Sequence, residues 1–262
     1  MSQMVGCTLA KSPASHQHKY EPKMQFIKGG EIVINNKKPT NLKNNKVKMK
    51  HFWMAKTETT YKQWENCFKN GGCKKDKYLP NVVYDKKSRS HYNNHPVTYV
   101  NWYEANEYTR WLSKISGKKY RLPTEAEWLF AARAGKTTRY PWGNTAGKNK
   151  ANCQLCDSGW DGTSTAPVGS FKPYGGLYDM YGNVMEWTCS SASAEEAPYP
   201  SGNETICANP TYTQPVILLG GNFETYKDRL DHRFKLKPSS SWGDEVAGFR
   251  VIREGVIKTE RK

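Results

Sequence analysis

The sequence predicts a single α+β domain with little regular secondary structure. Helix signals occur only between about residue 59 and residue 135 of the 262, and the other segments are short apolar runs separated by Gly, Asn and Pro. Although only 37% of the residues are hydrophobic, 9 Trp, 16 Tyr and 8 Phe supply large apolar side chains for a core. No change of composition divides residues 25–255, so we expect one domain there.

Polar segments flank this domain at both ends. Residues 1–24 are expected to form a flexible tether, because Lys11–His18 has no apolar period. Residues 256–262 are expected to form a basic tail. The domain itself should begin with two short strands, at Met24–Ile27 and Glu31–Ile34.

A first helix is expected to begin at Thr59 or Thr60 and to end at Gly71–Gly72. Thr is a good N-cap residue, and two consecutive glycines are a common helix stop. Apolar residues at helical spacing should form the buried face, namely Tyr61, Trp64 and Phe68.

Two further helices carry clear start signals. Asn101 can cap a helix with Glu104 reaching back to it, and Gly117 should end that helix. Thr124 and Glu127 form a capping box for a third helix, which should end at Gly135. The expected inner faces are Ala105, Tyr108, Thr109 and Leu112 in the former helix, and Trp128, Ala131 and Ala132 in the latter.

The charge predicts an anionic partner. Lys and Arg number 40 against 24 Asp and Glu, which leaves a formal net charge of +16. No helix-turn-helix, zinc-finger or RNA-binding signature accompanies the charge, so we do not expect nucleic acid. We expect an acidic protein or an anionic membrane surface instead. No run of about 18 apolar residues predicts a membrane span.

Six of the seven cysteines pair by proximity in the sequence. A CxxC zinc or thioredoxin-type motif is the competing interpretation of one pair, but no second pair of zinc ligands lies at a suitable spacing, and the flanking residues are typical of a loop. Local disulfides are therefore expected, and they indicate an oxidising compartment outside the cytoplasm. The expected pairs are Cys67 with Cys73, Cys153 with Cys156, and Cys189 with Cys207.

The seventh cysteine, Cys7, follows Met4-Val5-Gly6, which is similar to the end of a lipobox. A bacterial lipoprotein would be acylated at such a cysteine, and we expect a lipid-anchored protein of the periplasm or outer envelope. The alternative is an odd free thiol.

Five strings in order carry a family resemblance: Tyr120–Trp128, Tyr140–Asn144, Thr165–Phe171, Gly176–Trp187 and Gly248–Val251. Their order and spacing resemble the formylglycine-generating enzyme (sulfatase-modifying factor) family over residues 25–253. The resemblance implies an elaborated C-type-lectin-like α+β fold in a single domain. The cysteine arrangement also resembles a bacterial secreted or lipoprotein branch of that family, which supports the three proposed pairs.

The founding activity of the family oxidises a substrate cysteine with oxygen, using Cu(I) held by two thiolates. In the matching segment, Gly220–Leu230, the two thiolate positions carry Thr225 and Leu230, and no cysteine follows Cys207. Thiolates suit Cu(I), whereas a hydroxyl or an alkyl group does not replace them. The sequence therefore predicts no copper, no catalytic residue of this type, and no enzyme of the copper class.

The resemblance further implies calcium in loops that lack regular structure. For the first of two implied sites, the alternative is that Asp179 and Glu186 bind loop amides. One implied site comprises Asp179, Glu186 and the carbonyls of Gly182 and Val184, and a second comprises Asn152 and Asp161 with carbonyls near Cys153 and Thr163.

These observations favour a catalytically inactive binding protein on this scaffold, for instance one of the immunity type, which would bind a toxin or another acidic protein. The alternative is a periplasmic enzyme of the same family with non-copper chemistry, as in siderophore maturation, and a plain structural module stays open as well. Aromatic and arginine side chains dominate binding surfaces. The partner residues expected are Glu224, Thr225, Tyr226, Arg229, Arg233, Trp242 and Trp142, with the lysines at 37, 38 and 43 contributing little each.

Overall fold

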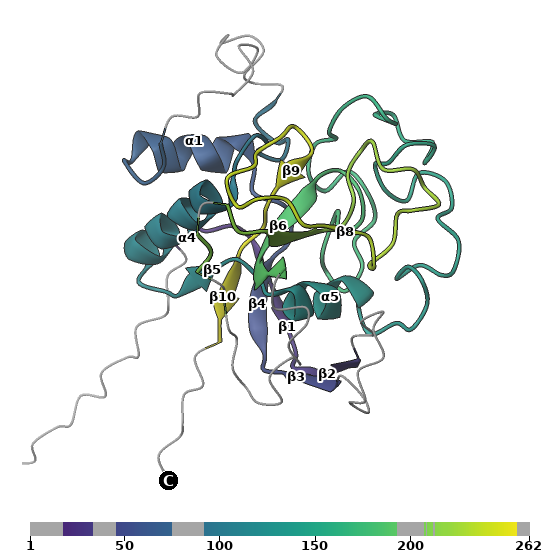
Figure 1. The fold of residues 1–262 in the computed structure, drawn as a ribbon, viewed down its shortest axis with the longest axis horizontal. Coiled ribbons are helices and arrows are strands. Elements are labelled where there is room, and N and C mark those ends of the chain that lie inside the picture. Colours follow the sequence, from purple (N-terminus) through teal and green to yellow (C-terminus); the bar gives the residue numbers. More distant parts are fainter. Residues whose placement is uncertain are drawn as a thin grey trace, which may run out of the picture.

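The computed structural model describes residues 18–33, 46–74, 92–192, 207, 209–211 and 213–255. The helices and strands are short (Figure 1). In chain order they are β1 (Met24–Ile27), β2 (Gly30–Val33), β3 (Lys46–Met49), β4 (Phe52–Ala55), α1 (Tyr61–Lys69), α4 (Trp102–Ser116), β5 (Tyr120–Arg121), α5 (Glu125–Arg133), β6 (Met185–Ser191), β7 (Val216–Leu219), β8 (Lys235–Leu236), β9 (Ala247–Gly248) and β10 (Ile252–Glu254).

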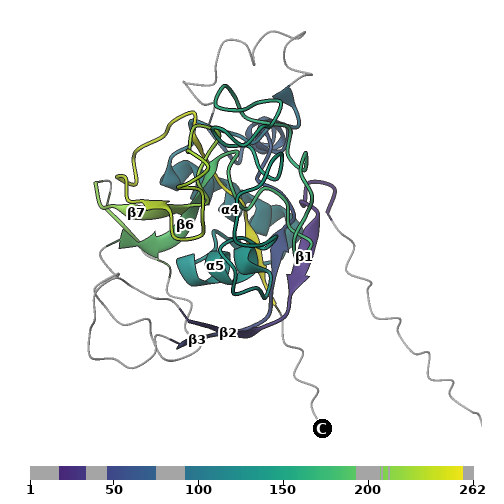
Figure 2. The ribbon, with the colours of Figure 1, turned by 90° about the vertical axis from the view of Figure 1, so that its right-hand side faces the viewer.

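Two four-stranded sheets and a hairpin organise these elements. The first sheet has the order β1-β4-β10-β5 and is antiparallel throughout. The second has the order β8-β7-β6-β9, in which β9 runs parallel to β6. Strands β2 and β3 form a separate hairpin, which lies at one end of the molecule in both ribbon views (Figures 1 and 2). The α+β class and the C-type-lectin-like character expected from the sequence are confirmed.

The sheets separate two apolar cores. Alternate residues of β7 contact different cores, with Leu218 in the core that contains α1 and α4 and Leu219 in the core that contains α5. The same alternation occurs in β4, where Ala55 belongs to the first core and Met54 to the second. Both strands therefore contribute side chains to both cores. Within the described residues, no helix is both long enough and apolar enough to cross a lipid bilayer.

The three expected helices form with the expected N-caps. Thr60, Asn101 and Thr124 each accept from the third helical backbone N–H, and each helix has a complete capping box. The predicted burial of Phe68 is wrong: Phe68 is 41% exposed, because Cys67 takes the inner position of α1 instead. The third helix ends at Arg133, with Ala134 as its C-cap just before the expected Gly135.

Loops without helix or strand connect α5 to β6 over residues 134–184. Close backbone packing holds them: Gly182 has φ +81°, and a Cβ at this position would overlap the carbonyl oxygen of Asn152. The predicted disulfides Cys67–Cys73, Cys153–Cys156 and Cys189–Cys207 are all present.

Candidate functional site

The two positions that the resemblance assigns to copper thiolates lie close together in the structure. Thr225 is 7% exposed and Leu230 is fully buried. Gly221 follows β7 and lies against both, since a Cβ built on it would be 2.7 Å from Leu230 Cδ1 and 3.3 Å from Thr225 Oγ1. The two positions therefore converge, but they present a hydroxyl and an isobutyl group where Cu(I) requires thiolates.

The hydroxyl of Thr225 is occupied within its own turn. It donates to Asn222 Oδ1 at 3.0 Å and accepts from the Asn222 backbone N–H at 3.0 Å. Asn222 Oδ1 also accepts from the Glu224 backbone N–H at 2.9 Å. Every cysteine that the structure describes is in a disulfide, and Cys7 lies outside the described residues. In this part of the chain, no free thiol is available for copper chemistry.

The turn after Thr225 reaches the surface beside the Cys153–Cys156 disulfide. Gln154 connects the two segments, because its N–H donates to the Thr225 carbonyl at 2.9 Å and its own carbonyl accepts from the Lys227 N–H at 3.0 Å. Tyr226 on one segment is 49% exposed and Leu155 on the other is 53% exposed. Two large apolar side chains are therefore exposed on two segments that hydrogen bonds and a disulfide hold in place.

Arginines flank this turn. The Arg139 guanidinium donates to the Asp228 carbonyl and lies 3.3 Å from the Asp231 carboxylate. Arg233 also pairs with Asp231, at 2.7 Å, although 71% of the Arg233 side chain stays exposed. Burial raises the pKa of Asp231, but the hydrogen bonds from Arg233 outweigh it and the pKa lies below its usual value. Asp231 therefore remains charged and orients both arginines.

An aromatic pair extends the same surface. Tyr140 donates from its hydroxyl to the Lys227 carbonyl at 3.2 Å, and its ring stacks on Trp142 with centroids 5.0 Å apart and an interplanar angle of 8°. By contrast, Trp242 packs edge-on against Trp187 and contacts the core of α1 and α4. The structure thus does not group Trp242 with the other expected partner residues.

We call the remaining set the loop face. It combines an exposed turn, two arginine side chains and an aromatic pair on one rigid base. Sequence reasoning missed its Leu155, although an apolar residue between two paired cysteines in a polar loop is a detectable signal. The loop face comprises Glu224–Arg229, Arg233, Arg139, Tyr140, Trp142 and Leu155.

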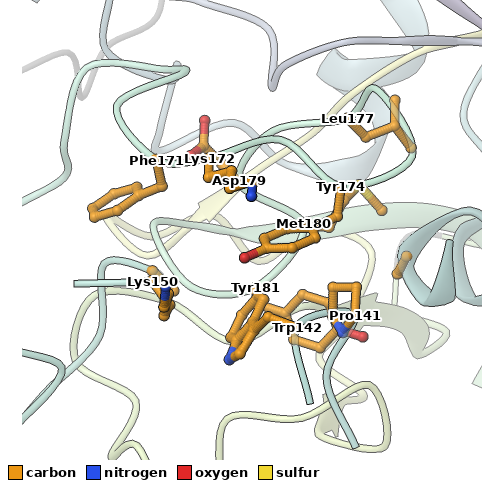
Figure 3. A pocket seen from close by; sticks show the side chains of 12 residues that line it. Pro141, Trp142, Lys150, Phe171, Lys172, Tyr174, Leu177, Asp179, Met180 and Tyr181 are labelled. Carbon is orange, nitrogen blue, oxygen red and sulfur yellow. The ribbon is translucent and has the colours of Figure 1, made fainter. Parts of the chain in front are cut away.

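A small hollow lies beside the loop face (Figure 3). Its accessible volume is about 20 Å³, and Trp142, Tyr174, Tyr181 and Asp179 contribute to its lining. The rings of Tyr174 and Tyr181 pack against Trp142, with centroids 5.2 Å and 5.4 Å away. Such a volume holds about one water molecule.

Below the hollow, the fold buries a cluster of charges. Arg250 and Glu186 are 0% and 1% exposed, and the guanidinium forms two bonds of 2.7 Å with the carboxylate. Trp128 donates from its indole N–H to the same carboxylate at 2.8 Å. A buried bidentate pair of this kind is stable only when its remaining polar atoms are also satisfied.

Two more carboxyl groups belong to this cluster. Glu58 is fully buried, accepts from Asn183 Nδ2 at 3.0 Å through one oxygen, and has no hydrogen-bond partner for the other. Asp179 accepts from the Gly169 N–H through Oδ2, while its Oδ1 has no partner. Burial, together with the neighbouring Asp179 carboxylate, raises the pKa of Glu58 well above its usual value. Burial also raises the pKa of Asp179, to about 6.

The first calcium set fits only in part. Asp179 Oδ1 accepts from no N–H group, although the Asp179 carboxyl lies within hydrogen-bonding reach of Glu58, and the expected carbonyls of Gly182 and Val184 lie in the buried loop between Asp179 and Glu186. Both oxygens of Glu186, however, are bound to Arg250. Arg250 thus supplies the positive charge at Glu186, and this carboxylate does not fit a calcium ligand in the arrangement described.

The side chains of the second calcium set also form hydrogen bonds to other groups of the protein. Asn152 Oδ1 accepts from the Ser158 hydroxyl at 2.8 Å. Asp161 accepts from the backbone N–H groups of Leu155 at 2.6 Å and Asp157 at 2.9 Å. These side chains therefore bind loop groups, and the Cys153 carbonyl accepts from the Cys156 N–H at 3.2 Å. Calcium at both sets stays a prediction.

Comparison with known proteins identifies the family to which this fold belongs. Residues 10–255 match the Sulfatase-modifying factor enzyme 1-like domain. The chain is 42% identical over 158 residues to a formylglycine-generating enzyme of Thermomonospora curvata, covering 52% of this chain and 48% of that one. It is 31% identical over 256 residues to the serine/threonine-protein kinase pkn1 of Chlamydia caviae, covering 88% of this chain and 38% of that protein.

Among solved structures, PvdO from Pseudomonas aeruginosa superposes with a TM-score of 0.72 at 25% identity, over 90% of this chain and 96% of PvdO. The chain therefore belongs to the formylglycine-generating enzyme (sulfatase-modifying factor) family. It spans less than half the length of the two curated relatives described above.

Proposed function

We propose that the chain is a catalytically inactive binding protein that uses the scaffold of its family to present the loop face. One observation carries this proposal: the two converging positions of the family's copper site hold Thr225 and Leu230, both buried and neither a thiolate. Without the two copper thiolates, the scaffold still supplies rigid loops. Function depends on the site that these loops form rather than on the fold alone.

The loop face supports a protein partner. Tyr226 and Leu155 expose apolar surface, while Arg229 is exposed and Arg233 is held by Asp231. Tyr and Arg are enriched among the residues that dominate binding energy. Since the chain carries a formal charge of +16, an acidic partner would be attracted over long distances and would associate faster at low salt.

The proposed location is outside the cytoplasm. Three disulfides support this, because local disulfides persist in oxidising compartments. We propose that Cys7 carries the lipid anchor and that the protein is an envelope lipoprotein, with a toxin or another acidic protein as its partner. A gene for a secreted toxin beside the gene for this chain would favour the immunity role.

The second candidate, an enzyme of the family with non-copper chemistry, needs space for a substrate next to reactive groups. The hollow at Asp179 brings a carboxyl group of raised pKa to a lining of aromatic side chains, which is the observation in its favour. Its volume of about 20 Å³ admits about one water molecule, so we favour binding over catalysis.

The test is site-specific photo-crosslinking in the native envelope. A photoreactive phenylalanine analogue replaces Tyr226 on the loop face and, as a matched control, Phe68 on α1, which is 41% exposed at a different surface. We expect one abundant crosslinked protein at position 226 and none at position 68. The crosslink should weaken when Arg229→Ala is added, because that change removes an anchoring side chain.

Equal crosslinking at both positions, or a crosslink that Arg229→Ala leaves unchanged, would contradict the loop face as the binding surface. Turnover of a substrate by the purified chain, abolished by Asp179→Asn, would support the enzyme instead.

A further inference from the structure

The end of the molecule formed by β2, β3 and the adjoining turns has a charge that the loop face does not explain. Residues 23–33 and 46–56 contain six lysines and one glutamate, Glu31. Four of these lysines surround the hairpin, and all four are exposed: Lys28, Lys46, Lys48 and Lys50. None of them forms an ion pair with a carboxylate among the described residues.

The hairpin directs these charges outward. Its inner residues, Ile32 and Val47, are 5% and 8% exposed and pack into the core that contains α5. The pairing places Val33 opposite Lys46 and Glu31 opposite Lys48, so one outward row combines two lysines and one glutamate with an aliphatic side chain that is 39% exposed.

The turns next to the hairpin join it to β1 and β4, which carry aromatic side chains close to these turns. Gly29 lies against Lys50, since a Cβ built on it would be 3.0 Å from the Lys50 carbonyl carbon. Phe26 on β1 is 43% exposed, and its ring lies 5.1 Å from Trp53 on β4 and 5.8 Å from His51. We call Phe26, Lys28, Val33, Lys46, Lys48 and Lys50 the hairpin face.

The sequence adjoining this surface adds positive charge. Residues 34–45, which connect β2 to β3, contain three lysines and neither aspartate nor glutamate. The described chain ends at Gly255, which lies against the His51 ring, and residues 256–262 contain three basic residues and one acidic residue. Residues 34–45 and 256–262 therefore adjoin the lysine-rich end in the sequence, and both segments carry a net positive charge.

We propose that the hairpin face docks on an anionic lipid membrane. Lysines beside exposed aromatic and aliphatic side chains are typical of interfacial binding, because the ammonium groups attract lipid headgroups while the apolar side chains enter the acyl boundary. A nucleic-acid surface would instead favour arginines and a groove of stacked aromatic rings.

This inference goes beyond the proposed function, since it assigns a second face with a different partner. The hairpin face and the loop face lie on different sides of the molecule, so both can be occupied at once. In Figure 1 the hairpin lies at the bottom of the molecule, while the loops between α5 and β6 lie at its right side. Ten residues lie between Cys7 and His18, and these eleven steps span at most about 40 Å when extended, so the proposed lipid anchor stays within that distance of the described part of the chain.

The experiment uses the full chain with Cys7→Ser, so that no acyl group contributes to binding. Co-sedimentation with vesicles of phosphatidylcholine alone, or with about 30% phosphatidylglycerol, measures partitioning. We expect binding to the anionic vesicles, which added salt weakens.

The test variant carries Lys46→Gln and Lys48→Gln, and the control carries Lys136→Gln and Lys150→Gln, two exposed lysines outside the hairpin face. Both lose two charges. A lysine near an anionic surface contributes about fivefold in partitioning, so the hairpin variant should bind about 25-fold more weakly and the control variant less than about threefold.

Equal losses in the two variants would overturn the proposal, because net charge alone would then explain binding. Equal binding to neutral and anionic vesicles would overturn it as well, and so would binding to an oligonucleotide with no binding to vesicles. Since the crosslink at Tyr226 concerns a different face, failure of either proposal is distinguishable from failure of the other.

Discussion

Replacing Asp179 with asparagine is expected to stabilise the fold at neutral pH. The aspartate is buried beside Glu58, its Oδ1 has no partner, and its pKa rises from 3.8 to about 6. Each pKa unit corresponds to about 1.4 kcal/mol, so the ionised form costs the fold up to about 3 kcal/mol at pH 7. Asparagine keeps the acceptor for the Gly169 N–H, offers Glu58 a donor, and tolerates the backbone φ of 56°.

The pH dependence of this effect has a definite sign. Because the folded-state pKa of Asp179 lies above its unfolded value, its stabilising contribution is complete below about pH 4 and is lost as the pH rises through about 6. The advantage of Asp179→Asn in the free energy of unfolding should therefore be small at pH 4 and should grow up to about pH 7.

The assay is urea unfolding at several pH values in the presence of EDTA, with fluorescence as the probe. Asp157→Asn is the matched control, since Asp157 also has a positive φ, of 57°, but is an exposed partner of Lys148. The control should change stability by less than about 0.5 kcal/mol. A loss of stability in Asp179→Asn at pH 7 in EDTA would refute the reasoning.

Repeating the assay with about 1 mM calcium tests the expected metal, because a ligand that binds only the folded state raises its stability. Calcium that stabilises the natural chain and not Asp179→Asn would support a site at Asp179. No change with calcium in either protein would contradict it.

Three further predictions concern the buried cluster, the loops and the anchor. Arg250→Ala should cost about 3–5 kcal/mol in unfolding free energy, because it leaves Glu186 charged and unpaired in the core; loss of less than about 1 kcal/mol would contradict that role. Gly182→Ala should lower the unfolding free energy by more than about 2 kcal/mol, because its Cβ would overlap the Asn152 carbonyl and the positive φ disfavours alanine. An unchanged melting temperature in calorimetry would contradict this. Mass spectrometry of protein from its native host without reductant should show three disulfides and a diacylglycerol group on Cys7, whereas six free thiols would contradict the compartment.

The helices were predictable because their signals are local. Capping boxes at Asn101 and Thr124 depend on residues three positions apart, and both helices begin where the sequence indicates. Phe68 was misplaced because its spacing, seven residues from Tyr61 and four from Trp64, is that of a buried helix face. The disulfide to Cys73 turns Cys67 inward and leaves the phenyl ring exposed, and no local pattern encodes that choice.

Only the site residues that lie in a family motif could be predicted from the sequence. Thr225 and Leu230 were located from the family's spacing, and the structure brings them together. Glu58 lies 128 residues from Glu186 and was missed, because the burial that raises its pKa depends on long-range packing. Trp242 was assigned to the partner surface by residue type, and the structure shows it partly buried and packed edge-on against Trp187, a long-range contact that residue type alone does not indicate.

The most direct test of catalytic inactivity is a peptide oxidation assay. The purified chain is incubated with Cu(I), oxygen, a thiol reductant and a peptide that contains Cys-x-Pro-x-Arg, and mass spectrometry measures formylglycine. The account predicts no product above the protein-free blank, because Thr225 and Leu230 offer copper no thiolate. Formylglycine formed at a rate above that blank would contradict the central claim.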